Sequence, residues 1–339
     1  MASKRKRVTI GVGVAAAVVI TLGVGIGTAN AATRRPWWDR WHPKPVASAS
    51  AKPSPSVTSS ATPSPAPSSA APSASAPAPA PSTSAPASPV PSPSATKPGT
   101  FATPPANATF DYQIGGPYTP PSGVTVVSRD YTATPAAGIY NICYVNAFQT
   151  QPDAESWWKT NHPELLLKDK NGKIVEDEDW GELFLDFSTD AKRTALTTIV
   201  GGWIDQCATK GFKAVEPDNL DTYTRSNGLL TEDQAVAYSA SLAAYAHGKG
   251  LAIGQKNTAE LSTAKAKKAG FDFAVAEECG TWGECGAYTA TYGNNVIVIE
   301  YDQSGFTKAC NSHGSKVSVV QRDRDVTAPG SKSYVWKAC

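Results

Sequence analysis

Short apolar runs alternate with longer helix-like segments through the second half of the chain, and this alternation is the feature that most constrains the fold. Nine runs have the composition of β-strands: residues 109–115, 124–130, 139–148, 182–188, 212–219, 251–257, 271–278, 295–301 and 316–323. Helix-like segments span residues 191–211, 230–250 and 259–270. Strands that alternate with helices at this spacing predict a parallel sheet with crossover helices.

We predict an α/β fold in which these strands close into a single (β/α)8 TIM-type barrel, with residues 182–188 left over as a short extra strand. An open, doubly wound sheet is the alternative. No glycine-rich phosphate loop follows any of the predicted strands, so the sequence gives no support to a dinucleotide site, and we expect no cofactor.

The first 31 residues have the pattern of a secretory signal peptide. A basic start at residues 4–7 precedes an apolar stretch, and the small-residue site Ala29-Asn30-Ala31 follows it. The alternative is an uncleaved membrane anchor, because residues 8–27 are nearly long enough to span a bilayer. Cleavage predicts a secreted protein with no membrane attachment of its own.

Residues 32–106 are predicted to be a disordered linker. They begin with the tryptophan cluster Trp37, Trp38 and Trp41, and 18 of the 27 prolines of the chain lie between Pro43 and Pro105. A segment of Pro, Ala, Ser and Thr has too little apolar surface to offset the entropy of ordering. Such a tether can hold an exported domain at the cell wall, and it leaves residues 107–339 as the folded domain.

Charge is divided unevenly between the two parts. Residues 1–106 contain ten Lys and Arg and one acid, or +9, whereas residues 107–339 contain 21 Lys and Arg and 28 Asp and Glu, or −7. Nucleic acid is an improbable partner for the folded domain, because phosphate binding needs a basic face. A cationic ligand would be attracted to it. We expect the domain to act as a monomer.

All six cysteines lie in the predicted domain, as expected of disulfides in an exported protein. Six cysteines allow 15 pairings. The spacing favours Cys279 with Cys285 and Cys310 with Cys339, which leaves Cys143 with Cys207. The four histidines are not spaced near a cysteine pair as zinc ligation requires, so we expect no metal site.

Most of the predicted strands end in a polar residue. These residues are Gln113, Asp130, Asp218, Asn257, Glu277, Glu300 and Asp323. Active-site residues of α/β barrels lie at the carboxyl ends of the strands, so the pattern predicts an acidic barrel mouth. Carboxylates without a histidine partner or a metal cluster favour glycoside hydrolysis, which needs one carboxyl as proton donor and a second that is ionised. Asp218 and Glu277 follow different strands and can face each other across a cleft.

Several motifs resemble the family 114 glycoside hydrolases. They are Tyr112-Gln113, Cys143-Tyr144, the Trp180–Glu182–Asp186 spacing, EPDNLD at 216–221, QKN at 255–257, AEEC at 276–279 and IEY at 299–301. Members of that family are endo-α-1,4-polygalactosaminidases with a barrel fold, and the resemblance spans about residues 109–325.

The resemblance implies a retaining hydrolase of α-1,4-linked galactosamine and N-acetylgalactosamine polymer. Asp218 would be the nucleophile and Glu277 the acid/base. The family has Gln at the position of Glu278, so Glu278 stays open as the alternative acid. Lys256 would keep Asp218 ionised. The residues expected to bind substrate are Gln113, Tyr144, Asp186, Glu216, Asn219, Asp221, Lys256, Asn257, Glu278, Glu300 and Tyr301.

Two other functions are compatible with the same residues. One is a non-catalytic module that binds cell wall or exopolysaccharide, and the other is a glycosidase that acts on a neutral α-galactoside. The intact pair of Asp218 and Glu277 favours an enzyme, and the acidic domain favours an amino-sugar substrate. The sequence leaves open the linkage, the tolerated acetylation, and whether the producer's own matrix is the target.

Overall fold

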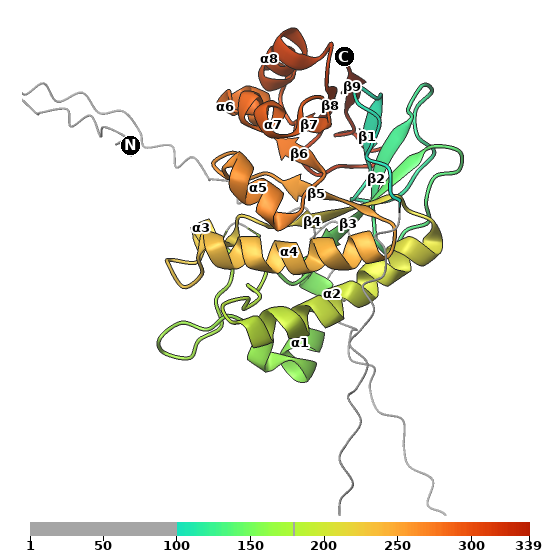
Figure 1. Ribbon diagram of the computed structural model, residues 1–339. Coiled ribbons are helices and arrows are strands. Elements are labelled where there is room, and N and C mark those ends of the chain that lie inside the picture. Colours follow the sequence, from blue (N-terminus) through green and yellow to red (C-terminus); the bar gives the residue numbers. More distant parts are fainter. Residues whose placement is uncertain (1–99, 179) are drawn as a thin grey trace, which may run out of the picture. The chain divides into compact units, whose positions relative to one another are not determined.

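The structure, a computed structural model, describes residues 100–178 and 180–339 (Figure 1). The predicted signal peptide, the tryptophan cluster and residues 32–99 of the predicted linker lie outside the described residues. Within those that are described, no helix has the length and apolar character needed to cross a membrane.

Eight parallel strands pair in chain order, each with the next. They are β1 (Phe110–Tyr112), β2 (Val126–Asp130), β3 (Tyr140–Asn146), β4 (Ala214–Asp218), β5 (Ala252–Lys256), β6 (Phe273–Glu277), β7 (Val296–Glu300) and β8 (Ser318–Arg322). Each lies within one of the runs predicted to be strands. The run at 182–188 lies outside the barrel strands, as predicted, but it forms isolated bridges and not the short extra strand that was expected.

The sheet curves into a nearly closed barrel, which confirms the predicted fold class. A ninth strand, β9 (Trp336–Ala338), was not predicted and pairs antiparallel with β8. The indole N–H of Trp336 donates to the carbonyl of Phe110 on β1 at 3.1 Å. Arg322 of β8 forms a buried ion pair with Asp111 of β1 at 3.0 Å. Side chains thus join the first and last parallel strands.

Helices cover the outside of the barrel (Figure 1). They are α1 (Glu155–Asn161), α2 (Asp190–Lys210), α3 (Thr222–Arg225), α4 (Glu232–Gly248), α5 (Thr263–Ala269), α6 (Cys279–Trp282), α7 (Cys285–Tyr292) and α8 (Gln303–His313). The predicted helices correspond to α2, α4 and α5. Thr231 and Gln234 form a capping box at the start of α4, and Gly211 ends α2 with a left-handed φ of 95°.

Successive residues of each strand face opposite sides of the sheet, and this alternation separates two cores. Phe110, Ile142 and Phe273 belong to the core inside the barrel. Cys143 and Val215 belong to a second core, between the sheet and the helices. The same alternation decides which residues at the strand ends face the barrel mouth.

Three disulfides fix the outer layer. Cys143 of β3 is bonded to Cys207 of α2, Cys279 of α6 to Cys285 of α7, and Cys310 of α8 to Cys339. These are the pairings that the spacing favoured.

Candidate active site

A cavity of about 230 Å³ opens at the carboxyl ends of the barrel strands. Its lining comes from strand ends and from the loops that follow them: Tyr112, Ile114, Gly115, Tyr144, Trp180, Glu182, Asp218, Asn219, Asp221, Arg225, Asn257, Glu277, Glu278, Tyr301, Arg324, Asp325 and Val326. This end of the barrel is where active sites of the fold are found.

Lys256, the last residue of β5, places one buried positive charge beneath the cavity. Its ammonium lies 3.1 Å from Glu216, 3.1 Å from Asp218 and 3.4 Å from Glu277. Burial lowers the pKa of Lys256, but the charges of Asp218, Glu277 and Glu216 raise it well above its usual value. The ammonium is therefore charged at neutral pH.

Asp218 ends β4, and three donors stabilise its ionised form. It accepts hydrogen bonds from the hydroxyl of Tyr144 at 2.7 Å, from the backbone N–H of Asn219 at 2.7 Å and from Lys256 at 3.1 Å. Burial raises the pKa of Asp218, but the charge of Lys256 and the Tyr144 hydrogen bond outweigh burial and hold the pKa below its usual value.

Glu277 ends β6, on the other side of Lys256 from Asp218. Asn257 binds it twice, because the side-chain amide donates to Oε2 at 2.9 Å and the amide oxygen accepts the backbone N–H of Glu277 at 2.8 Å. The hydroxyl of Tyr301 donates to Oε1. Burial and the charge of Glu277 raise the pKa of Tyr301 well above its usual value, so Tyr301 remains a donor. The orientation of this carboxyl is thus fixed at both oxygens.

The shared contact with Lys256 limits how far apart the two carboxyls can be. Oδ1 of Asp218 lies 3.1 Å and Oε2 of Glu277 lies 3.4 Å from the same nitrogen, so these oxygens cannot be further apart than the sum of the two distances. Carboxyls of retaining glycosidases are about 5–5.5 Å apart, and those of inverting enzymes about 6.5–9.5 Å. The sum reaches only the lower edge of the second range.

Glu216 lies below the cavity and does not line it. Its side chain is fully buried, and the hydroxyls of Tyr112 and Ser128 donate to its two oxygens at 2.9 and 2.6 Å. Burial raises the pKa of Glu216. The residue faces the barrel interior, as expected of a position two residues before Asp218, and it supports Lys256 from beneath.

The remaining acids of the cavity wall differ in their partners. Asp221 pairs with Arg225, and Glu278 pairs with Arg324 at 3.1 Å. Glu182 instead accepts hydrogen bonds from two amides, those of Asn146 at 2.9 Å and Asn219 at 3.2 Å. Burial raises the pKa of Glu182 to about 8, because the amides only partly offset the desolvation of its carboxylate.

The residues that follow three consecutive strands have left-handed backbones. Asn219 follows β4 with φ 68°, Asn257 follows β5 with φ 48°, and Glu278 follows β6 with φ 57°. Asn tolerates this conformation better than Glu does. Strained positions gather at binding and catalytic sites, where the surrounding structure holds them. Here they turn the chain sharply, so that Asp218 and Glu277 stay at the cavity.

Five of the residues expected to bind substrate do not line the cavity: Glu216 and Lys256 lie beneath it, and Gln113, Asp186 and Glu300 lie elsewhere. Gln113 is fully buried and accepts a hydrogen bond from Arg129 on the outer side of the sheet, because Tyr112 takes the inward position of that strand. Asp186 is paired with Lys192, at the start of α2. Glu300 faces the helices, because Tyr301 takes the inward position after β7.

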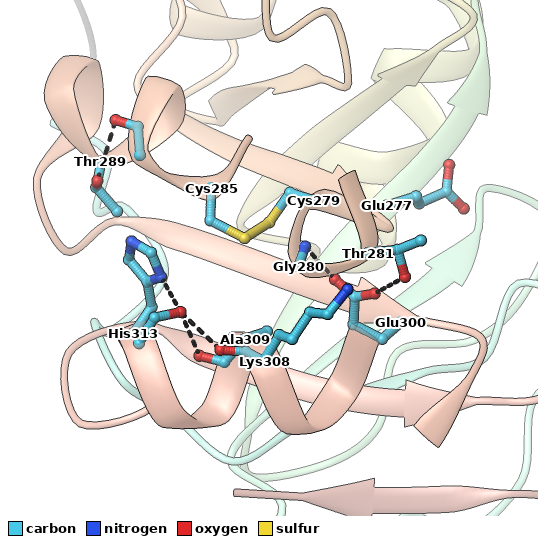
Figure 2. The surroundings of a disulfide bond; sticks show 12 residues. Glu277, Cys279, Gly280, Thr281, Cys285, Thr289, Glu300, Lys308, Ala309 and His313 are labelled. Atoms are coloured by element: carbon cyan, nitrogen blue, oxygen red, sulfur yellow. Dashed lines mark hydrogen bonds between the residues drawn. A yellow bond between two sulfur atoms is a disulfide. The ribbon is translucent and has the colours of Figure 1, made fainter. Parts of the chain in front are cut away.

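Glu300 holds the helical turn that follows Glu277. Figure 2 shows its carboxylate turned toward α6, where it accepts hydrogen bonds from the backbone N–H of Gly280 at 2.6 Å and from the hydroxyl of Thr281 at 3.0 Å. Cys279, Cys285 and Glu300 form a group of potential metal ligands within 4.8 Å of one another. The two sulfurs are joined in a disulfide, so the group lacks the thiolates that metal ligation uses.

Nine lining residues were not among the expected site residues: Tyr112, Ile114, Gly115, Trp180, Glu182, Arg225, Arg324, Asp325 and Val326. Three of them, Tyr112, Trp180 and Glu182, belong to motifs on which the resemblance rested. Arg225 ends the short helix α3 and Arg324 follows β8, and no periodic pattern of the sequence marks either position.

Two solved structures have similar folds. Ega3 from Aspergillus fumigatus, determined in complex with galactosamine, is 23% identical with a TM-score of 0.54, and the match covers 71% of this chain and 100% of that chain. The glycoside hydrolase domain of PelA from Pseudomonas aeruginosa is 14% identical with a TM-score of 0.46, and the match covers 67% of this chain and 98% of that chain. No curated protein matches the chain in sequence.

The sequence model of glycoside-hydrolase family GH114 matches residues 91–339, which is most of the chain and includes every strand of the barrel. The chain therefore belongs to glycoside-hydrolase family GH114 and is a glycoside hydrolase.

Proposed function

We propose that the protein is an endo-acting hydrolase of α-1,4-linked galactosamine and N-acetylgalactosamine polymer. One observation carries the proposal: Asp218 and Glu277, from β4 and β6, meet in one cavity on either side of Lys256. Membership of GH114 and the likeness to a fold solved with galactosamine support the substrate class. The acidic domain suits a polymer with free amines.

Asp218 is the proposed nucleophile. Its pKa lies below the usual value, so it is ionised at neutral pH, and Tyr144 and Lys256 hold it in place. In the first step an oxygen of Asp218 bonds to C1 of the sugar while the bond from C1 to the glycosidic oxygen breaks. Glu277 gives its proton to that oxygen, and the shortened polymer leaves.

Glu277 then acts as the base of the second step. Its carboxylate takes a proton from water, the hydroxide oxygen bonds to C1, and the bond from C1 to Asp218 breaks. Both carboxyls return to their starting states, and the anomeric configuration is retained. The limit on their separation supports retention. Glu277 is favoured over Glu278 as the proton donor because Glu277 shares the contact with Lys256 that holds Asp218, whereas Glu278 pairs with Arg324.

Lys256 compensates charge in both steps. Before the reaction Asp218 carries the negative charge, and after the glycosyl–enzyme forms Glu277 carries it. One buried ammonium contacts both carboxyls, so the charge moves between them without leaving its counterion.

Export completes the proposal. We propose that residues 1–31 direct secretion and that residues 32–106 tether the catalytic domain outside the cell, at the cell wall or free of it. The three disulfides support an oxidising compartment.

The proposal is tested by product release from partly deacetylated α-1,4-galactosamine polymer. Wild type is compared with Asp218→Asn and Glu277→Gln, and mass spectrometry detects the oligomers. We expect wild type to release oligomers whose new reducing ends first form in the α configuration, and both variants to lose at least about 1,000-fold in rate. Release by Asp218→Asn at the wild-type rate would exclude the proposed nucleophile. Cleavage of a neutral α-galactoside instead would exclude the amino-sugar substrate.

A further inference from the structure

The acids that line the cavity differ in whether a cation of the protein neutralises them. A protein cation contacts four of them, in the pairs Asp218–Lys256, Glu277–Lys256, Asp221–Arg225 and Glu278–Arg324. A fifth, Asp325, follows β8, four strands away from β4 around the barrel. Glu182 is hydrogen-bonded by the neutral amides of Asn146 and Asn219. Burial raises the pKa of Glu182 more than the charge of Arg225 lowers it, and the Arg225 guanidinium donates to Asp177, Asp221 and Asn219.

Burial makes the lack of a cation bonded to Glu182 unfavourable. Glu182 is only 5% exposed, yet it lines the cavity. A buried carboxylate is unfavourable unless a cation and hydrogen bonds compensate it, and the two amides supply hydrogen bonds without charge. Both amides donate to Oε2, which leaves Oε1 for a partner in the cavity. A ligand that carries a positive charge would supply what the site lacks.

Asn219 connects Glu182 directly to the proposed nucleophile. Its backbone N–H donates to Oδ1 of Asp218 at 2.7 Å, and its side-chain amide donates to Oε2 of Glu182 at 3.2 Å. A nucleophile bonds to C1 of the sugar, and the C2 substituent is attached to the next carbon. The carboxyl of Glu182, linked to Asp218 through Asn219, is therefore the group that we expect to reach that substituent.

We infer that Glu182 binds the C2 ammonium group of the sugar whose C1 reacts, and that it selects galactosamine over N-acetylgalactosamine at this position. The inference rests on the proposed function and adds a residue that determines specificity. An ammonium offers three donors and a positive charge to Oε1, whereas an acetamide is neutral. Binding of the ammonium favours the ionised form of Glu182, whose proton passes to solvent, and the ion pair forms in the cavity.

The test compares Glu182→Gln with a matched control. Gln keeps the shape of the side chain, and its carbonyl can still accept from Asn146 and Asn219, so the fold has no reason to change. Glu176→Gln makes the same substitution at an exposed position of the same segment, whose backbone bridges to Leu183 next to Glu182. Glu182→Asp keeps the charge on a shorter side chain.

Two measurements are made on each protein. The first is kcat and KM on fully deacetylated and on highly N-acetylated polymer, and the second is the Kd of galactosamine and of N-acetylgalactosamine by calorimetry. We expect Glu182→Gln to raise KM and Kd for the amine at least about tenfold, with less than about twofold change for the acetylated sugar. Glu182→Asp should lie between wild type and Gln, and Glu176→Gln should match wild type.

Two outcomes would overturn the inference. One is unchanged preference for galactosamine in Glu182→Gln. The other is an equal loss of kcat on both polymers with KM unchanged, because that would give Glu182 a part in the chemical steps. Wild type that binds galactosamine through Glu182 but releases no oligomers would contradict the proposed function alone. Wild type that cleaves, with selectivity unaffected by Glu182→Gln, would contradict the inference alone.

Discussion

The ammonium of Lys256 contacts three carboxyl groups, so its removal should change the pKa of Asp218 as well as the activity. Burial by itself raises the pKa of Asp218, and the charge of Lys256 is the main influence that lowers it. A neutral Lys256→Met side chain would therefore raise the pKa of Asp218.

We expect Lys256→Met to reduce kcat/KM at least about 100-fold and to move the acid limb of the pH profile to higher pH. The direction follows because the proposed nucleophile acts when ionised, and its activity falls as pH drops through its pKa. The profile of kcat/KM against pH measures the limb, with circular dichroism at each pH as the control for folding. An acid limb at the wild-type position would show that Lys256 does not set the pKa of Asp218.

Glu182 should destabilise the fold at neutral and alkaline pH. Its folded pKa of about 8 lies above the usual value for Glu, so between these two values the folded state holds a proton that the unfolded state has lost. The free energy of unfolding therefore falls as pH rises through this window.

We expect Glu182→Gln to be as stable as wild type near pH 4 and more stable by on the order of 2–4 kcal/mol at pH 8. Urea unfolding at pH 4, 6 and 8 measures the difference. A difference that does not change with pH would mean that the pKa of Glu182 is not raised. A residue that lowers stability and is retained fits a binding role, since active sites commonly trade stability for function.

At the scale of elements, the contact of α6 with α8 positions the end of β6. Gly305, in the first turn of α8, lies against Thr281 and the carboxylate of Glu300, and an added Cβ would overlap both. A Cβ added to Gly280 of α6 would in turn lie only 2.6 Å from the carbonyl oxygen of Gly305. Because α6 begins one residue after Glu278, a shift of this helix would move Glu277 as well.

We expect Gly305→Ala to lower the free energy of unfolding by about 1–3 kcal/mol and to reduce kcat. Gly202→Ala is the matched control: it lies within α2, an added Cβ meets nothing within 4 Å, and Ala favours a helix over Gly by about 0.5–1 kcal/mol. Thermal unfolding and kcat are measured for both variants. Equal effects of the two substitutions would argue against close packing at Gly305.

At the scale of the whole molecule, charge should govern binding of the polymer. Residues 107–339 carry 21 Lys and Arg against 28 Asp and Glu, so a polymer with free amines is attracted and one with acetylated amines is not. We expect added salt to weaken binding of deacetylated polymer more steeply than binding of fully acetylated polymer. The affinity of each polymer is measured at salt concentrations from about 50 to about 500 mM, and its change with salt gives one slope for each polymer. Equal slopes would contradict a role for the domain's charge.

The sequence allowed the eight parallel strands to be predicted, and with them the barrel, because each strand is a short apolar run followed by a helix or a loop. It also indicated Asp218, Lys256 and Glu277, since each ends such a run. The sequence did not show on which face of the sheet the side chain at each strand end lies. Parallel strands are buried on both faces, so their apolar residues do not alternate with polar ones. For this reason Gln113 and Glu300 were expected at the cavity and lie outside the barrel.

By itself, then, the sequence indicated the order of the eight parallel strands and the residues that end them, and it favoured the cysteine pairing found, because these depend on local composition and spacing. Only the tertiary structure decided which acids share a cation and which do not. Glu182 lies in the long connection between β3 and β4, 36 residues before Asp218, and its amides come from Asn146 and Asn219 on either side of that connection. Burial and charge depend on neighbours brought together by folding, and no local pattern contains them.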